Sequence, residues 1–148
     1  MKLRPPPLVL AALMACSTAF ATPCDRAATE SLLARIDAAW QARDSQAMAA
    51  LYAPQASLAI NAGAIKAQGR EAVRKTFHAL FAEIEAGNVH QLSLRLISEH
   101  GAVCVVDAVA AVGVPGDQQR FVGTYVLAEQ AAPSAGLQIL AARATEIR

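Results

Sequence analysis

The sequence predicts one α+β domain in which helices come first and a sheet follows. The chain has 148 residues, a usual length for a single domain. Apolar side chains mostly recur at helical spacing up to about residue 84, and they mostly alternate with a period of two from residue 89 onward. Because the two patterns are segregated, we expect three helices packed on a curved antiparallel sheet of four long strands, plus a short hairpin.

Residues 1–21 have the features of a secretory signal. Basic residues near the N-terminus precede an uncharged apolar run at 8–15, and Ala-Phe-Ala at 19–21 puts small residues where a signal peptidase reads them. The run is too short to span a membrane as a stable anchor. We therefore expect a mature domain, residues 22–148, that is periplasmic or secreted and carries no transmembrane segment.

A second processing signal overlaps the first. Leu13-Met14-Ala15-Cys16 resembles a bacterial lipoprotein box, which would attach a lipid to Cys16. Met14 is an unusual residue for that box, whereas residues 19–21 form a good ordinary cleavage site. The sequence therefore favours soluble export, and a lipid anchor through Cys16 is the alternative.

The mature chain would keep two cysteines, Cys24 and Cys104. An even pair in an exported protein predicts a disulfide. This bond would join the start of the first helix to a strand in the second half of the chain. The alternative is a pair of buried free thiols.

Composition and motifs argue against several classes of function. The 13 Lys+Arg residues nearly balance the 12 Asp+Glu residues, and no basic cluster indicates nucleic-acid binding. His90 and His100 lack metal-ligand spacing, and no HxxxH or CxxC pattern occurs, so we expect no metal site. There is also no phosphate loop, dinucleotide fingerprint or GxSxG elbow, and we expect no cofactor.

The first two helices meet at Asp44-Ser45, which are good N-cap residues for the second helix. From Asp25 onward, charged residues surround an apolar stripe that predicts the first helix: Leu32, Leu33, Ile36 and Trp40. We expect Pro54 to end the second helix. Its apolar face would be formed by Met48, Leu51 and Tyr52.

A small hairpin and the clearest helix follow. Two short apolar runs, residues 57–60 and 64–68, flank Asn61-Ala62-Gly63 and predict the hairpin. After Gly69, an apolar stripe predicts the third helix: Val73, Phe77, Leu80, Phe81 and Ile84.

The rest of the chain predicts a four-stranded meander. Turn signals, such as Pro115-Gly116-Asp117, separate the expected strands at 89–99, 102–114, 120–129 and 137–147. Alternation in the first strand puts four residues on one face: His90, Leu92, Leu94 and Leu96. In the third strand it groups Phe121, Tyr125 and Leu127.

A family resemblance is carried by residues spread over almost the whole mature chain. They are Ile36, Trp40, Asp44, Leu51-Tyr52-Ala53, Gly63, Gly69-Arg70-Glu71-Ala72-Val73, Phe77 and Phe81, with weaker matches at 101–103 and 120–121. With this element order, the chain resembles the NTF2-like cone fold and, within it, the SnoaL-like or SgcJ/EcaC group, a domain of unknown function. The superfamily includes isomerases, cyclases, hydrolases and proteins that only bind ligands or partners, so the fold does not settle the activity.

The resemblance implies a conical, mostly apolar pocket between the helices and the sheet. Trp40, Tyr52 and Phe77 would line it, and Tyr125 would either point its hydroxyl into it or be an ordinary core tyrosine. In the steroid-isomerase branch, an aspartate on the short hairpin acts as general base. Residues 57–61 of this chain contain no carboxylate, so we do not expect that mechanism here.

Asp107 and Tyr125 are the best candidates for a catalytic pair. Asp107 lies within a long apolar strand, where a carboxyl group could act as an acid or a base. The alternative is a surface carboxylate, or one paired with Arg120 or Arg143. Strand alternation puts Asp107 and Cys104 on opposite faces, so a disulfide at Cys104 would turn Asp107 away from the helices.

The strand at 102–114 is apolar on both faces, so its outer face needs a cover. We expect a homodimer through the outer sheet face, which the resemblance also implies.

Three functions remain open. The chain could bind a small hydrophobic ligand, act as a cofactor-free isomerase or cyclase by acid–base chemistry, or bind a partner through the sheet. The missing hairpin carboxylate favours the first.

Overall fold

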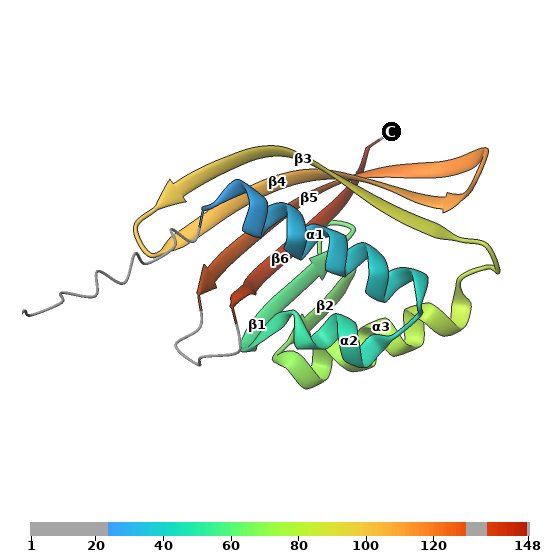
Figure 1. Ribbon diagram of the computed structural model, residues 1–148. Coiled ribbons are helices and arrows are strands. Elements are labelled where there is room, and N and C mark those ends of the chain that lie inside the picture. The colour runs from blue at the N-terminus through green and yellow to red at the C-terminus, as the bar shows by residue number, and fades with distance from the viewer. Residues whose placement is uncertain (1–23, 130–135, 148) are drawn as a thin grey trace, which may run out of the picture.

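The computed structural model describes residues 24–129 and 136–147. The proposed signal segment, the lipoprotein box at Cys16 and most of the turn at 133–136 lie outside these residues. Figure 1 shows the described elements, which are the helices α1 (Arg26–Gln41), α2 (Ser45–Ala50) and α3 (Arg70–Glu83), and the strands β1 (Tyr52–Ile60), β2 (Ile65–Gln68), β3 (Val89–His100), β4 (Val103–Val114), β5 (Asp117–Glu129) and β6 (Leu137–Ile147).

The described strands form one sheet of six, in the order β2-β1-β6-β5-β4-β3. The meander from β3 to β6 is antiparallel, as predicted. The hairpin, however, belongs to the same sheet, because β1 pairs with β6 in parallel and β2 forms the edge. The expected antiparallel four-stranded sheet with a separate hairpin is therefore corrected to a mixed sheet. β1 and β6 are far apart in sequence, so no local pattern predicts their pairing.

Side chains cap the first two helices, and the cap at Asp44 was predicted from the sequence. The Asp25 carboxylate accepts the N–H of Ala28 at 2.8 Å. The Asp44 carboxylate accepts the N–H groups of Gln46 and Ala47 at 3.0 and 2.9 Å. Both predicted apolar stripes face the sheet, and their buried members are Leu32, Leu33, Ile36, Trp40, Val73, Phe77 and Phe81.

The start of β1 corrects the prediction for Tyr52 and Pro54. The helix α2 ends before Tyr52, which is the first residue of β1. Pro54 lies inside β1, between Tyr52 and Ser57, where the pairing with β6 shifts its register. A proline has no N–H to donate, and it is tolerated in a strand where the ladder is irregular. Leu51 joins helix and sheet, because its carbonyl accepts the N–H of Ile139 at 2.9 Å.

A bulge in β3 reverses the face of Leu96. The register of β3 against β4 shifts between Leu94 and Leu96, and residues beyond such a shift change sides. Leu92 and Leu94 pack against the core as predicted, whereas Leu96 is 54% exposed and Ile97 packs inward. The prediction that Leu96 shares a face with His90 is wrong, because strict alternation cannot anticipate an extra residue in a strand.

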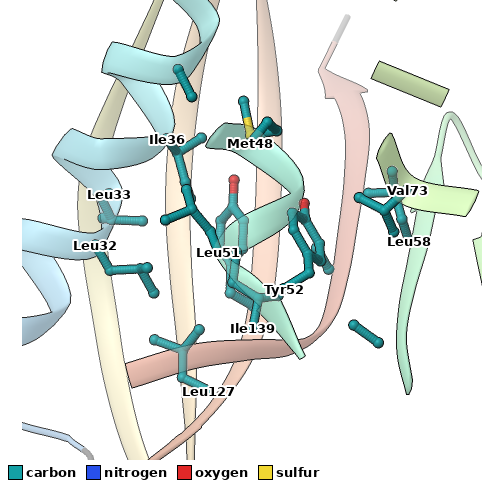
Figure 2. Close-up of a cluster of buried hydrophobic side chains, with 14 of the residues drawn as sticks. Leu32, Leu33, Ile36, Met48, Leu51, Tyr52, Leu58, Val73, Leu127 and Ile139 are labelled. Atoms are coloured by element: carbon teal, nitrogen blue, oxygen red, sulfur yellow. The ribbon is translucent and has the colours of Figure 1, made fainter. Parts of the chain in front are cut away.

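The three helices lie on one side of the curved sheet (Figure 1). Figure 2 shows the core between them, where Leu32 and Ile36 of α1 lie near Leu127 and Ile139 of the sheet. Leu127 and Ile139 are fully buried. No helix in the described part of the chain is both long and apolar enough to cross a membrane.

Candidate functional site

A cavity of about 420 Å³ lies between the helices and the inner face of the sheet. This volume suits a small organic molecule. Trp40, Tyr52, Phe77 and Tyr125, the four residues that the sequence singled out for a pocket, all line it. The other wall residues are mainly apolar, and they come from every helix and strand described above. The few polar side chains in this mostly apolar wall are therefore the candidates for a chemical role.

Asp37 and His90 form a hydrogen-bonded pair, and the His90 member of the pair lines the cavity. The Nδ1 atom of His90 lies 2.7 Å from Oδ1 of Asp37, although the residues are 53 positions apart. The same carboxylate accepts the backbone N–H of Leu92 at 3.1 and 3.2 Å. The His90 side chain, which is only 9% exposed, lines the cavity. A carboxylate beside Nδ1 favours the tautomer with its proton on that nitrogen, and in the neutral imidazole Nε2 is then the proton acceptor. This arrangement can act as a general base.

Trp40 holds the same imidazole by stacking. The ring centroids of Trp40 and His90 lie 4.6 Å apart with an interplanar angle of 26°. The indole Nε1 of Trp40 donates to Oδ1 of Asn88 at 3.1 Å, which fixes the orientation of the indole. Asp37 and Trp40 are three residues apart on α1, so they share one helix face. One helix thus supplies both the hydrogen-bond partner and the stacking partner of His90.

Tyr52 and Tyr125 bring two hydroxyl groups to the cavity wall. The side chains are 3% and 9% exposed. Burial raises the pKa of both hydroxyls above the usual range, and the charge of Asp37 adds to the effect at Tyr125. Neither hydroxyl hydrogen-bonds to a residue that the structure describes, and neither is closed off from the cavity space. Both therefore stay protonated and available as donors.

Asp107 lies away from the cavity, on the outer face of the sheet. Its carboxylate accepts the hydroxyl of Thr124 at 2.6 Å, rather than pairing with Arg120 or Arg143. Asp107 faces Thr124 across β4 and β5, and Tyr125 is the next residue along β5, so Tyr125 points to the other face. The structure does not bring the sequence-derived pair, Asp107 and Tyr125, together.

Cys24 and Cys104 are free thiols in this structure, and they are neighbours. The Cys24 thiol lies 3.7 Å from the carbonyl oxygen of Ser98 and 4.0 Å from that of Val103, the residue before Cys104. Burial, together with the adjacent Cys24 thiol, raises the pKa of Cys104. The disulfide between them stays a prediction.

The mouth of the cavity is polar. Its exposed polar lining residues are Asn61, Glu85, Asp117, Gln119 and Arg143. The hairpin contributes an amide, Asn61, to this lining, and residues 57–61 contain no carboxylate. Within residues 24–129 and 136–147, no group of three or more His, Cys, Asp or Glu side chains is arranged to hold a metal ion.

The Asp37–His90 pair escaped the sequence analysis. Asp37 read as one of several charged residues on the solvent side of an amphipathic helix, and His90 read as a histidine without metal spacing. One signal was present, because alternation grouped His90 with the inward residues Leu92 and Leu94. That signal placed the imidazole inside, but it could not reveal its partner on α1.

Comparison with protein families identifies a SnoaL-like domain over residues 29–132. Comparison with curated proteins gave no match. Among solved structures, a domain of unknown function with a cystatin-like fold from Nostoc punctiforme has a TM-score of 0.72 and 17% identity, covering 84% of this chain and 78% of that one.

Two other solved structures carry functional names. A ketosteroid isomerase-like protein from Erwinia carotovora atroseptica has a TM-score of 0.68 and 13% identity, covering 82% of this chain and 95% of that one. A proposed dehydratase of the NTF2-like family from Streptomyces avermitilis has a TM-score of 0.64 and 17% identity, with the same coverage of 82% and 95%. These identities establish a shared fold and not a shared activity. The family match spans most of the chain, and the protein belongs to the SnoaL-like family with the NTF2-like fold.

Proposed function

We propose that the protein binds a small, largely apolar molecule in the cavity between its helices and sheet. The observation that carries this proposal is the cavity of about 420 Å³ itself, with apolar walls and a few polar side chains placed among them. This combination is typical of ligand sites, because the apolar walls supply affinity and the polar groups set orientation. The proposal includes export, which the N-terminal sequence supports and which fractionation of expressing cells would test.

Two neighbouring alanines test the pocket. Ala110 lines the cavity, whereas Ala111 is the next residue on β4 and points to the other face. We expect Ala110→Leu to weaken binding of 2-isopropylnaphthalene about tenfold or more, because the added side chain occupies the ligand's space. Ala111→Leu should leave the affinity unchanged. Equilibrium dialysis measures both, and equal effects of the two substitutions would contradict the proposed location.

General acid–base catalysis is the second candidate function, and the Asp37–His90 pair favours it. The pair places a proton acceptor at the cavity wall, and it takes over the role that the sequence analysis assigned to Asp107. Solved structures with this fold include a ketosteroid isomerase-like protein and a proposed dehydratase, which supports this candidate. In this scheme, His90 removes a proton from a carbon beside a carbonyl group and later returns one, and Asp37 stabilises the imidazolium.

Deuterium exchange tests the catalytic proposal. We expect the protein to accelerate exchange of the methyl protons of 2-acetylnaphthalene with D₂O. His90→Gln and Asp37→Asn should each slow the protein-catalysed exchange by about 100-fold or more, because a positioned base typically contributes that much. Asp107→Asn should leave the rate unchanged, because its carboxylate lies on the outer face. Proton NMR follows the exchange, and a full rate in His90→Gln would remove the histidine from the mechanism.

Homodimer formation through the outer sheet face is supported by the apolar side chains there. Val122 is 40% exposed, and Val105, Val109 and Val126 are half-buried on the same face. Covering these groups with the same face of a second copy would remove them from water. A different protein partner on this face is the alternative.

A charge on that face should separate the copies. We expect wild-type protein to be dimeric and Val122→Lys to be monomeric, because a lysine at the centre of an apolar contact would be buried without a partner. Gln46→Lys, at an exposed site on α2, is the control and should remain dimeric. Size-exclusion chromatography with light scattering gives the mass of each, and a monomeric wild type would contradict the proposed interface.

A further inference from the structure

Two opposite charges lie on the outer face of the sheet, one on each side of β5. Figure 1 shows β5 between β4 and β6. Asp107 of β4 is paired with Thr124 of β5, and Thr124 is paired with Arg143 of β6. Residues that face each other across neighbouring strands share a face of the sheet. The three side chains therefore form one row across the outer face, with the threonine in the middle.

Arg143 belongs to this row although it also borders the cavity. It lies between Ala142 and Ala144, which line the cavity as well. Ala142 pairs with Tyr125 on the inner face, so alternation turns the side chain of Arg143 to the outer face. The guanidinium is therefore available to a partner that covers the sheet.

Neither charge has an ionic partner in the part of the chain that the structure describes. Asp107 is half-buried, and its carboxylate accepts only the hydroxyl of Thr124, at 2.6 Å. Arg143 is exposed, and the salt bridges among described residues include neither it nor Asp107. A carboxylate that is partly removed from water is stabilised by a cation. The outer face thus carries both halves of an ion pair, and β5 keeps them apart.

Two-fold symmetry determines which of these charges meet when two outer faces pack together. If the axis runs along β5, each strand on one side of β5 lies opposite the equivalent strand on its other side in the partner. Asp107 of each copy then lies opposite Arg143 of the partner subunit. An axis across the strands would instead bring each charge opposite its own copy, and like charges in an interface repel. Charge complementarity therefore favours the axis along β5.

The other outward residues of β5 fit this axis. Val122 and Val126, which flank Thr124 on the same face, would each meet their own copy along the axis. Such self-contacts suit apolar side chains, because they bury the same group from both copies. Arg120 is the remaining charged residue of β5 on this face. It pairs with Ile147 at the end of β6, so it lies at the margin of the contact.

The axis also gives the most exposed apolar side chain of the face an apolar partner. Leu96 is 54% exposed and pairs with Asp107, so it lies two strands from β5. Ala59 of β1 is half-buried and pairs with Arg143, so it lies two strands from β5 on the other side. The axis along β5 places Leu96 of one copy opposite the small side chain of Ala59 in the other.

We propose that two reciprocal ion pairs hold the homodimer, each between Asp107 of one copy and Arg143 of the other, across a two-fold axis that runs along β5. This inference rests on the homodimer proposed above, and it names the residues and the symmetry of its contact. Thr124 holds the carboxylate in place by donating to it, and the carboxylate keeps lone pairs for a guanidinium. The pairs would fix the orientation of the two apolar faces.

Exchanging the two charges tests the proposal. Asp107→Arg and Arg143→Asp should each weaken dimerisation about 100-fold or more, because each substitution creates two contacts between like charges. The double variant should dimerise like the wild type. An equimolar mixture of the two single variants should form a heterodimer, because each contact then joins an arginine to an aspartate. Sedimentation equilibrium measures the dissociation constants. Glu83→Arg, an exposed charge reversal on α3, is the control and should dimerise normally.

The possible failures can be told apart. Circular dichroism first verifies that each variant is folded. A dimeric wild type whose dissociation constant is unchanged by both charge reversals would overturn the ion pairs while leaving the homodimer. Single variants that are rescued neither by mixing nor by the double substitution would overturn the axis along β5. A wild type that is monomeric at every concentration would overturn the homodimer itself, and the ion pairs with it.

Discussion

Oxidised wild-type protein is expected to have a free energy of unfolding about 4 kcal/mol above that of the reduced protein, the chain-entropy value for closing so long a loop. A bond between Cys24 and Cys104 would restrict the unfolded chain over most of the described domain. The two thiols are already neighbours, beside the carbonyl groups of Ser98 and Val103. The folded state therefore needs little adjustment to close the ring. The bond would join the segment just before α1 to the start of β4, next to the turn that connects β3 and β4.

Urea unfolding of four samples measures this effect. Wild type and Cys24→Ala are each unfolded in oxidised and reduced form, with mass spectrometry to verify the loss of two protons on oxidation of the wild type. Only the wild type should gain stability on oxidation. Cys24→Ala is the matched control, because its oxidation cannot form the bond while the buried Cys104 remains in place. An oxidised wild type that keeps both thiols reactive toward a thiol reagent after unfolding would refute the pairing.

Leu127→Ala is expected to destabilise the domain by about 3 kcal/mol, within the usual range for truncating a buried leucine. Leu127 is fully buried and pairs across the sheet with Cys104 on one side and Ile139 on the other. Figure 2 places it beneath the residues of α1. The truncation leaves a cavity that the paired strands cannot collapse to fill, so both the lost burial and the empty space add to the cost.

Leu96→Ala removes the same atoms from the other face of the sheet. Leu96 is 54% exposed beyond the bulge in β3, so its truncation should change stability by only about 0.5 kcal/mol. Urea unfolding of the two variants, at constant redox state, compares them directly. A large loss at Leu96 would show that β3 continues its alternation without the bulge, as the sequence pattern alone suggested. It would also be seen if a partner covers this residue, which the mass of the wild-type particle would reveal.

Much of the fold follows from local sequence. The cap at Asp44 acts on N–H groups two and three residues away, so its residue type is enough to place the start of α2. The helical stripes follow from periodicity for the same reason, and the last strand, Leu137–Ile147, follows from the turn signal before it. Pro54 and Leu96 mark where local reasoning failed. A register shift lets the proline stay in β1 and turns the leucine outward, and both shifts are set by the partner strand.

In the candidate site, too, some features could be predicted from the sequence and others could not. The walls could be named from the sequence because Trp40, Tyr52, Phe77 and Tyr125 are large side chains on predicted inward faces or in the family pattern. The chemically active groups of the site could not be named from the sequence, because the role of a polar side chain depends on the residue it contacts in the fold.

The sequence by itself therefore determined the order of elements, most inward faces and the helix cap at Asp44, which depend on residues near one another in the chain. Only the tertiary structure decided the parallel pairing of β1 with β6, the outward position of Asp107 beside Thr124, and the bond between Asp37 and His90. Each of these contacts joins segments separated in sequence, and the pairing depends on how whole elements pack and in which register. The energy of such contacts is realised only after the loops between them have closed.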